Sequence, residues 1–333
     1  MPAPAATSRA VRFEEFGEPS EVLAVARVPA PRPGPGEALL RMTARPVNPS
    51  DLSLVRGRYG TLPDLPATPG LEGVGVVERP DPDGVGPPAG TRVVPLTTAP
   101  GTWADRMVAP VAMLVPVPDA VPDEHAAQLV VNPLTAWVLL HEELALAPGD
   151  WLLQSAAGST LGRIVLQLAR ARGLRTINVV RRAEQAEELR DLGADEIVVG
   201  ADDLAERVRA ITGGAGVPAA IDAVGGETGA AMAASLATHG TMITYGRLSQ
   251  QPTPLDGGAL VFRGTTVRGF WLVHWFHRSS PETVRDTVTA VLGAMADGSI
   301  TPPVEATYPL EDVREAVAHA ERPGRSGKVL LIG

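Results

Sequence analysis

The sequence predicts an α/β protein in which a doubly wound parallel sheet is joined to an irregular, barrel-like β domain. From Gly149 onward, apolar strands alternate with amphipathic helices, a pattern typical of a parallel sheet covered on both faces. The first hundred residues instead contain many short strands separated by turns rich in Gly and Pro. A loop of small residues, Gln154–Gly162, joins the first strand of the alternating region to its first helix.

The composition is that of a globular chain long enough for two domains. It has 333 residues, of which 44% are hydrophobic and 20% are charged. The net charge of −9 argues against nucleic acid or an anionic membrane as the main partner. No apolar stretch has the length needed to span a bilayer, and the first ten residues lack the apolar core of a secretory signal. The absence of cysteine excludes disulfides and thiolate zinc sites, and we expect a cytoplasmic protein.

The N-terminal region is expected to fold as short strands around one small helix. This helix ends near Arg56, and either Ser50 or Asp51 is expected to cap its start. The segment Gly57–Gly73 is dense in Gly and Pro and predicts a structured loop. The expected strands are Ala10–Phe13, Leu23–Val28, Glu37–Ala44, Val74–Glu78, Arg92–Pro95 and Gly101–Ala109.

Near Asp123 the pattern changes to helical spacing, which continues over Glu124–Leu144. Pro133 is expected to require a local break or a new helix start. Gln250–Gly258 predicts a polar loop. Strands are expected at Trp151–Gln154, Thr176–Val180, Glu196–Val199, Ala219–Asp222, Thr241–Tyr245, Thr266–Gly269 and Lys328–Ile332, and helices at Thr160–Arg172, Ala183–Leu192, Leu204–Thr212, Thr228–Ala237, Pro281–Asp297 and Leu310–Ala320.

The loop Gln154–Gly162 (QSAAGSTLG) has the chemistry of a phosphate-binding turn. A strand, a turn of small residues and a helix start, in that order, direct backbone N–H groups and the positive end of the helix dipole toward an anion. Gly158 and Gly162 have no Cβ, so a phosphate and the neighbouring strand can approach closely. The loop lacks the G-x-G-x-x-G spacing, so an ordinary strand-to-helix turn is an equally open interpretation.

The residues after the second strand of this region indicate which dinucleotide the turn would bind. In NAD-binding folds a carboxylate at this strand end holds the ribose 2′-hydroxyl, whereas arginine suits a 2′-phosphate. Here the strand ends in Arg181 and Arg182, with no carboxylate before Glu184. This pair predicts NADPH as the cofactor, and a solvated arginine pair is the alternative.

Taken together, these stretches resemble the medium-chain dehydrogenase/reductase superfamily, and within it the mitochondrial-type trans-2-enoyl-thioester reductases. The resemblance implies a GroES-like substrate domain at residues 1–125 and 273–333, a Rossmann domain at 126–272, and a homodimer. Asn48 and Leu71 stand where zinc alcohol dehydrogenases carry metal ligands, so no zinc site is expected. The matching stretches are NPSD (Asn48–Asp51), GRYGTLPDLPA (Gly57–Ala67), GLEGVG (Gly70–Gly75), GTW (Gly101–Trp103), VNPLTA (Val131–Ala136), GLRTINVVR (Gly173–Arg181) and RGFWL (Arg268–Leu272).

The same resemblance places the catalytic tyrosine of the family at Tyr59. A phenol is neutral at pH 7, donates a hydrogen bond and can transfer its proton. Outside the G-x-Y-G-x-L-P context, a packing role for such a turn tyrosine would be the stronger interpretation. The implied reaction in fatty acid metabolism transfers a hydride from NADPH to the β-carbon of an enoyl thioester of CoA or acyl-carrier protein, and a proton to the α-carbon.

The resemblance also implies a set of cofactor-binding residues. Asn132 is expected beside the nicotinamide, although a cap at the helix break is a competing interpretation. Glu72 is expected to brace its loop rather than to act as a general acid. The residues implied to bind the cofactor are Asn132, Gly158, Ser159, Thr160, Leu161, Arg181, Arg182, Tyr245, Gly246, Arg247, Phe270, Trp271, Leu272 and Lys328, the only lysine of the chain.

Two other functions stay open at this point. One is an NADPH:quinone or enone oxidoreductase, which would use the same fold and the same hydride donor. The other is a non-catalytic protein that binds NADPH as a sensor or scaffold.

Overall fold

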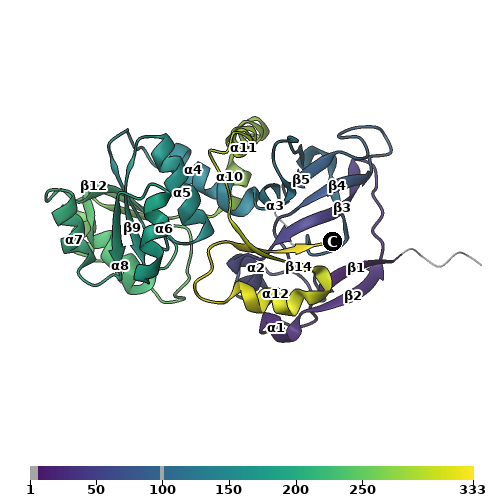
Figure 1. Cartoon of the computed structure of the whole chain (residues 1–333), viewed down its shortest axis with the longest axis horizontal. Coiled ribbons are helices and arrows are strands. Elements are labelled where there is room, and N and C mark those ends of the chain that lie inside the picture. Colours follow the sequence, from purple (N-terminus) through teal and green to yellow (C-terminus); the bar gives the residue numbers. More distant parts are fainter. Residues whose placement is uncertain (1–6, 98–100) are drawn as a thin grey trace, which may run out of the picture. The chain divides into compact units, whose positions relative to one another are not determined.

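The computed structural model describes residues 7–97 and 101–333, which divide into two compact units (Figure 1). The barrel unit comprises Met1–Pro133 with Thr289–Gly333, and the parallel-sheet unit comprises Leu134–Val288. The boundaries expected from the sequence, at 125/126 and 272/273, lie earlier in the chain. At both places the chain crosses between the units within a helical segment rather than a loop.

The parallel-sheet unit is built on six strands in the order β10-β9-β8-β11-β12-β13, and every neighbouring pair is parallel. This arrangement confirms the predicted doubly wound sheet. The strand order reverses direction between β8 and β11, which is where such sheets bind ligands. The strands are β8 (Trp151–Gln154), β9 (Arg175–Val180), β10 (Glu196–Val199), β11 (Val217–Asp222), β12 (Leu236–Thr244) and β13 (Thr266–Gly269).

Most helices of this unit follow strands, and α5 and α8 contact the sheet. The helix after β8, α5, carries an apolar stripe that includes the buried residues Ile164, Val165 and Leu168. Its N-cap is Ser159, whose side chain accepts a hydrogen bond from the Gly162 N–H at 3.1 Å. The helices are α4 (Thr135–Val138), α5 (Thr160–Ala171), α6 (Ala186–Asp191), α7 (Leu204–Ile211), α8 (Gly226–Ala234), α9 (Gly257–Phe262) and α10 (Leu272–Arg278), and α11 (Pro281–Ala296) crosses into the barrel unit.

The barrel unit contains a seven-stranded sheet in the order β14-β15-β3-β4-β5-β7, with β6 paired to β3, and a separate antiparallel pair, β1 and β2. Its strands are β1 (Thr7–Arg12), β2 (Ala24–Pro29), β3 (Glu37–Pro46), β4 (Val74–Arg79), β5 (Arg92–Pro95), β6 (Arg106–Pro110), β7 (Leu114–Pro116), β14 (Val304–Pro309) and β15 (Lys328–Ile332). Its helices are α1 (Pro19–Val22), α2 (Pro49–Val55), α3 (Asp123–Ala126) and α12 (Val313–Ala320).

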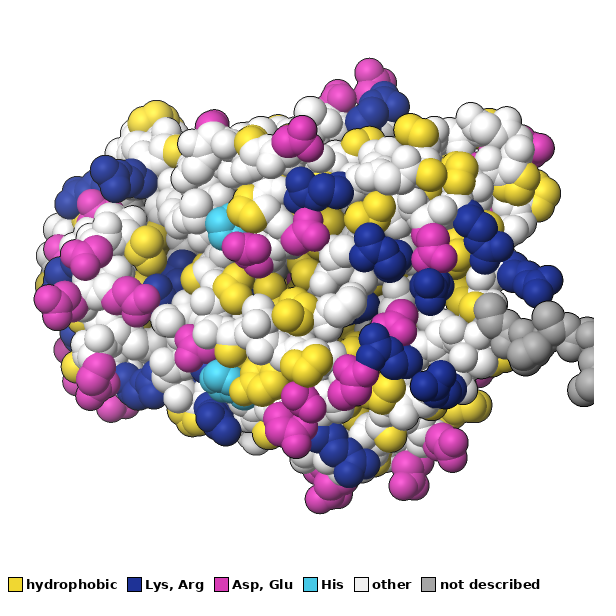
Figure 2. Space-filling model, turned by 45° about the vertical axis from the view of Figure 1, so that its right-hand side comes forward, with side chains coloured by type: hydrophobic (Ala, Val, Ile, Leu, Met, Phe, Trp, Pro, Cys, Tyr) yellow, Lys and Arg dark blue, Asp and Glu magenta, His cyan; other side chains and the backbone are white. Residues whose placement is uncertain are grey.

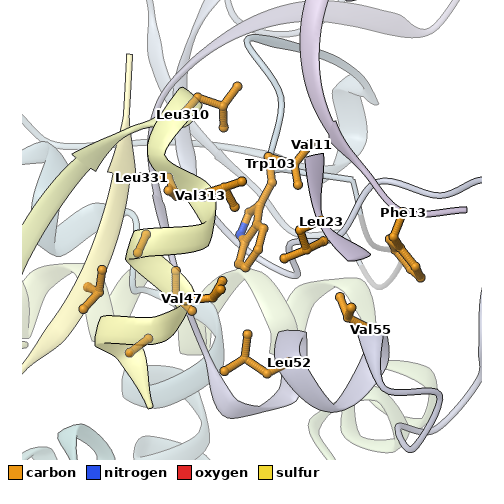
Figure 3. Packing of buried hydrophobic residues seen from close by; sticks show 14 of the residues in the cluster. Val11, Phe13, Leu23, Val47, Leu52, Val55, Trp103, Leu310, Val313 and Leu331 are labelled. Carbon is orange, nitrogen blue, oxygen red and sulfur yellow. The ribbon is translucent and has the colours of Figure 1, made fainter. Parts of the chain in front are cut away.

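Trp103 lies at the centre of the main core cluster of the barrel unit, between Leu23 and the residues Val313 and Leu331 (Figure 3). Its side chain is fully buried, and its indole N–H donates a hydrogen bond to the Pro46 carbonyl at 3.2 Å. The ring therefore gains burial without leaving its one polar group unpaired. Because the cluster combines residues from both ends of the chain, it joins the C-terminal helix α12 to the N-terminal strands.

The expected helix cap near residue 50 was wrong. The helix α2 begins at Pro49, and its N-cap is Asn48 rather than Ser50 or Asp51. The Asp51 carboxylate instead reaches back and accepts the Asn48 N–H at 2.8 Å. A proline at the first helical position needs no hydrogen-bond partner for its nitrogen, which favours the earlier start.

Two further expectations need correction, and the one for Pro133 takes a specific form. The strand expected over Gly101–Ala109 is confined to its second half, in β6. At Pro133 the α-helix is interrupted by a π-helical turn, Val130–Leu134, whose wider spacing accommodates the missing N–H, and α4 then starts at Thr135. The polar segment Gln250–Gly258 runs into a short helix, α9, rather than remaining a loop throughout.

The surface carries both signs of charge. On the face that Figure 2 shows, acidic and basic side chains of the described residues are interspersed. None of the helices in the described part of the chain is both long and apolar enough to cross a membrane.

Candidate functional site

The loop between β8 and α5 is fastened to both neighbouring strands. The Ser155 hydroxyl donates to the Asp222 carboxylate at the end of β11, at 2.7 Å. The Ala157 N–H donates to the Val179 carbonyl of β9 at 3.2 Å. The loop therefore lies at the carboxyl edge of the sheet, where the strand order reverses and where the predicted phosphate-binding turn was expected.

Both glycines of this loop lie in close contact with other residues, and at Gly162 the contact is with main-chain atoms that cannot rotate away. A Cβ at Gly162 would lie 2.5 Å from the Ala157 carbonyl oxygen, so the first turn of α5 touches the loop backbone. A Cβ at Gly158 would lie 2.2 Å from the side-chain nitrogen of Gln185. The carboxamide of Gln185 thus occupies the space that a side chain at position 158 would fill. Gln185 did not stand out in the sequence, since nothing in its local pattern places it against the loop.

A buried arginine supports the same loop from the helix side. Arg163 in the first turn of α5 is 5% exposed, and its Nε donates to the Gly158 carbonyl at 3.1 Å. Its guanidinium also forms an ion pair with Glu188 of α6. The sequence carried a signal for this contact that was missed: an arginine on the apolar stripe of a helix needs a buried partner.

The two predicted 2′-phosphate residues follow directly after β9. Arg181 is exposed and Arg182 is half-buried. Within residues 7–97 and 101–333, neither guanidinium has a hydrogen bond or an ion pair. Two free cations beside a turn with N–H donors suit a phosphate that approaches from solvent.

The segment after β12 brings Tyr245, Gly246 and Arg247 to the same edge of the sheet. The Tyr245 N–H donates to the Asp222 carbonyl at 2.9 Å, and a Cβ at Gly246 would lie 2.8 Å from the Ala223 carbonyl oxygen. The Tyr245 hydroxyl is buried, and no described residue supplies it with a hydrogen-bond partner. Burial raises the pKa of this phenol above its ordinary value. Arg247 is exposed.

The predicted cofactor-side wall, Phe270 to Leu272, follows β13 and begins α10. The Phe270 ring is 9% exposed, and its N–H donates to the Thr244 carbonyl at 2.9 Å. The Trp271 indole meets the His274 ring edge-on, with 5.0 Å between ring centres. Trp275, by contrast, is buried, and its indole N–H donates to Glu142 at 2.7 Å, which fits a packing role.

In the barrel unit, Tyr59 lies in the loop after α2. It is half-buried, and its ring packs against the core cluster around Trp103. The neighbouring residues Gly57 and Gly60 have φ angles of +69° and +35°, which only glycine adopts without strain. The loop conformation thus depends on the glycines that flank the tyrosine.

The barrel unit also buries a polar cluster formed by Asn48, Asp51, Glu72, Asn132 and Lys328. The Glu72 carboxylate accepts the Asn48 side-chain amide at 2.8 Å on Oε1. Its Oε2 accepts the Val130 N–H at 2.9 Å and the Val131 N–H at 2.8 Å. The Glu72 carboxylate therefore braces its loop, as expected, by tying it to Asn48 and to the π-helical turn.

Asn132 joins the cluster through Asn48. Its Nδ2 lies 3.3 Å from Asn48 Oδ1, and the residue is 7% exposed. Among the described residues, nothing donates a hydrogen bond to its Oδ1. The Asn132 side chain is therefore held on one side and keeps a free acceptor on the other.

Burial dominates the electrostatics of the cluster. It raises the pKa of Asp51 to about 7 and that of Glu72 to about 7. It lowers the pKa of Lys328 to about 8, an effect that the two carboxylates oppose. The Lys328 ammonium has no ion pair or hydrogen bond with any residue in the described ranges. Those ranges also hold no group of three or more His, Cys, Asp or Glu side chains arranged to bind a metal ion.

Comparison with known proteins identifies the class first. A model described as "Alcohol dehydrogenase GroES-like domain" matches residues 34–119, and one described as "Zinc-binding dehydrogenase" matches residues 160–290. These two domains in this order define the medium-chain dehydrogenase/reductase superfamily.

The curated relatives narrow the class to a family. The mitochondrial enoyl-[acyl-carrier-protein] reductase of Xenopus tropicalis is 36% identical over 334 residues, which cover 98% of this chain and 95% of that protein. The Homo sapiens protein of the same name is 33% identical over 328 residues, covering 97% and 88%. The chain therefore belongs to the family of mitochondrial-type enoyl-[acyl-carrier-protein] reductases.

Solved structures show the same fold over the whole chain. A putative NADPH:quinone reductase from Bacillus thuringiensis has a TM-score of 0.93 at 34% identity and covers 99% of this chain and 100% of its own. A complex of Etr1p with NADP and crotonyl-CoA has a TM-score of 0.87 at 25% identity, covering 98% and 100%. The neighbours thus include a protein named for quinone reduction and a complex that holds NADP together with an enoyl thioester, crotonyl-CoA.

Proposed function

We propose that this protein is an NADPH-dependent reductase of the C2=C3 double bond of trans-2-enoyl thioesters carried on CoA or acyl-carrier protein. The observation that carries the proposal is the end-to-end similarity to enoyl-[acyl-carrier-protein] reductases, at 36% identity over 98% of the chain. The arginine pair after β9 supports NADPH as the cofactor. A 2′-phosphate would supply the anionic partner that neither Arg181 nor Arg182 has among the described residues.

The residues of the parallel-sheet unit fit the cofactor on structural grounds. The twelve-residue helix α5 begins at the fastened loop, so its first N–H groups and its dipole favour a pyrophosphate there. Gly158, Ser159, Thr160 and Leu161 line this start. The unpartnered hydroxyl of Tyr245 lies at the next strand end, together with Gly246 and Arg247. We also assign Phe270, Trp271 and Leu272 of the parallel-sheet unit to the cofactor, as a wall beside it. From the barrel unit we assign Asn132 and Lys328. When bound, NADPH supplies the hydride that the thioester accepts at C3.

The protein's part in the reaction is to stabilise negative charge on the thioester oxygen and to supply a proton to C2. We assign both tasks to the Tyr59 hydroxyl, which is neutral at pH 7 and can donate a hydrogen bond and then a proton. Hydride addition at C3 and proton addition at C2 together saturate the bond, and solvent reprotonates the phenolate. A preorganised hydrogen-bond donor of this kind is worth several kcal/mol to a developing oxyanion.

Replacing Tyr59 by Phe tests this assignment. The change removes only the hydroxyl and keeps the ring on the core cluster, so the fold and the NADPH dissociation constant are expected to stay unchanged. Turnover of crotonyl-CoA is expected to fall by roughly 10- to 1000-fold. Undiminished reduction of the enoyl thioester by this variant would remove Tyr59 from the mechanism.

The competing function is NADPH:quinone or enone reduction, and the high TM-score of the Bacillus thuringiensis structure favours it as the second candidate. Assaying crotonyl-CoA and a simple quinone side by side separates the two, with kcat/KM as the measure. We expect the thioester to be the better substrate, and markedly faster quinone turnover would reverse the order. NADPH binding without oxidation by any of these acceptors would instead support a non-catalytic sensor.

We also propose that two copies form a homodimer. The strand β13 is an edge of the parallel sheet, and beside it α9 exposes Val261 at 74% and Phe262 at 87%. Apolar side chains of this size next to an open strand edge suit an interface. Light scattering on the purified chain measures the assembly mass directly, and a monomer at micromolar concentration would exclude the proposal.

A further inference from the structure

We propose that Glu72 is a positioning residue that sets the orientation of the Asn132 carboxamide through Asn48, so that Asn132 presents its carbonyl oxygen to the cofactor. The inference rests on the proposed function, because it assumes that Asn132 contacts bound NADPH. It goes further in assigning a task to a buried carboxylate that the reaction does not use directly.

The argument begins with the polarity of Glu72. A carboxylate anion can only accept hydrogen bonds. Its Oε2 accepts the Val130 and Val131 N–H groups, which are main-chain donors and cannot reverse. Its Oε1 therefore has to face a donor, and the group that faces it at 2.8 Å is the Asn48 side-chain amide. The charge on Glu72 thus requires the NH2 group of Asn48, and not its oxygen, to point toward it.

The orientation of the Asn48 amide in turn determines the orientation of the Asn132 amide. With its NH2 group turned toward Glu72, Asn48 directs Oδ1 the other way, and Asn132 Nδ2 donates to it at 3.3 Å. The main-chain groups of Asn48 are already paired with Asp51: the Asn48 N–H donates to the carboxylate, and the Asn48 carbonyl accepts the Asp51 N–H at 3.0 Å. The side-chain amide of Asn48 is therefore the group that links Glu72 to Asn132. We call this chain of hydrogen bonds, Glu72–Asn48–Asn132, the relay.

The end of the relay is a free acceptor. Asn132 uses its NH2 group on Asn48, and its Oδ1 has no donor among the described residues. An acceptor on Asn132 pairs with the carboxamide NH2 of a nicotinamide, whereas a donor would pair with the carboxamide oxygen and require the carboxamide to turn over. A chain of one carboxylate and two amides has only one fully bonded arrangement here, so Glu72 fixes what Asn132 offers.

The burial of the cluster explains why this arrangement persists. Asn48 and Glu72 are fully buried, so no water competes for the bonds between them. The groups that face Glu72 are Asn48, the two N–H groups of the π-helical turn, Asp51 and Lys328. Lys328 provides the only positive charge among the influences acting on Glu72, and it favours the anion.

Glu72→Gln tests the proposal because glutamine has the same shape as glutamate but replaces one acceptor oxygen with an NH2 donor. The glutamine oxygen must stay on the two N–H groups, so its NH2 group faces Asn48. Asn48 and then Asn132 must turn over, and Asn132 now presents its NH2 group. We expect the dissociation constant for NADPH, measured by fluorescence titration at pH 8, to rise roughly 10- to 100-fold. At that pH the wild-type carboxylate is above its pKa of about 7.

A second substitution separates positioning from a merely structural role. Asn132→Asp alone places a carboxylate against Asn48 Oδ1, so two acceptors meet and NADPH binding is expected to weaken by a similar factor. In the Glu72→Gln background, the turned Asn48 offers its NH2 group to the same aspartate, which again presents an oxygen. The double variant is therefore expected to bind NADPH within a few-fold of wild type, although each single variant binds poorly.

The outcomes are distinguishable. If wild type fails to bind NADPH, the proposed function fails. If wild type binds NADPH but Glu72→Gln binds equally well, the relay is absent while the proposed function stands. If Glu72→Gln does not fold, which thermal unfolding of the unliganded protein reports, Asn132→Asp alone decides, and unchanged NADPH binding there overturns the proposal. Additive losses in a folded double variant also contradict it, because a purely structural role predicts no rescue.

Discussion

Gly162 is the position where a single added methyl group should affect both the free energy of unfolding and NADPH binding. It is the third residue of α5, and the space next to its Cα is filled by the loop that we assign to the pyrophosphate. Substitution by alanine favours the helix by intrinsic propensity, by about 1 kcal/mol. Any loss must therefore come from the contact with the loop.

The size of that contact follows from the structure. The alanine Cβ would lie 2.5 Å from the Ala157 oxygen, 2.7 Å from the Ala157 Cα and 2.8 Å from the Ala156 oxygen. All three are main-chain atoms, so no side-chain rotation relieves them, and helix and loop must separate by about 0.9 Å to reach ordinary contact. Overpacking of this kind costs roughly 1–3 kcal/mol of unfolding free energy. A displacement near 1 Å in a phosphate-binding loop should weaken NADPH binding by roughly 10- to 100-fold.

Fluorescence titration with NADPH and denaturant unfolding measure the two effects on one sample. Gly293→Ala is the matched control, since Gly293 is an exposed helical glycine with no atom within 4 Å of an added Cβ. The control should raise the free energy of unfolding by roughly 0.5–1 kcal/mol and leave NADPH binding unchanged. If Gly162→Ala behaves like this control in both assays, the loop does not hold the cofactor in the way we describe.

Three further predictions concern the cofactor, the core and the buried charges. Arg181→Ala should weaken NADPH binding by roughly tenfold or more and leave NADH binding nearly unchanged, so a parallel loss for both cofactors would exclude a 2′-phosphate contact. Trp103→Ala should lower the free energy of unfolding by about 3–5 kcal/mol in a denaturant titration, and a loss below 1 kcal/mol would contradict the central place of this ring. Because burial raises the pKa of both Asp51 and Glu72 to about 7, the folded state holds protons that the unfolded state releases. Their contribution to stability should fall as pH rises from about 4 to about 7, and Glu72→Gln should flatten that slope; an unchanged slope would show that Glu72 does not titrate there.

Local patterns in the sequence predicted the parallel sheet well. The strands β8, β10 and β13 have the bounds expected from their apolar runs, since each is short and bounded by turn signals. The strand β14 was missed. Its side chains alternate between half-buried and exposed, and no strong apolar run marks it. The strand β14 is stabilised by parallel pairing to β15, and a local sequence pattern cannot reveal such a contact.

The site was predictable only where chemistry is local. Arg181 and the loop before α5 could be proposed as cofactor-binding residues because strand, turn and helix follow one another in the chain. Gln185 reaches Gly158 across 27 positions, and the polar cluster joins Glu72 to Val130 and Val131 across 58 and 59. Such contacts depend on how strands and turns fold back on one another, so a single sequence cannot display them.

The central claim is that this protein reduces an enoyl thioester by hydride transfer to C3. The most direct test incubates the purified chain with crotonyl-CoA and NADPH deuterated at the transferable C4 position, and locates deuterium in the product by NMR. The account predicts saturated butyryl-CoA with the cofactor's deuterium at C3 and a solvent-derived hydrogen at C2. An unreduced double bond, or label at any carbon other than C3, would contradict it.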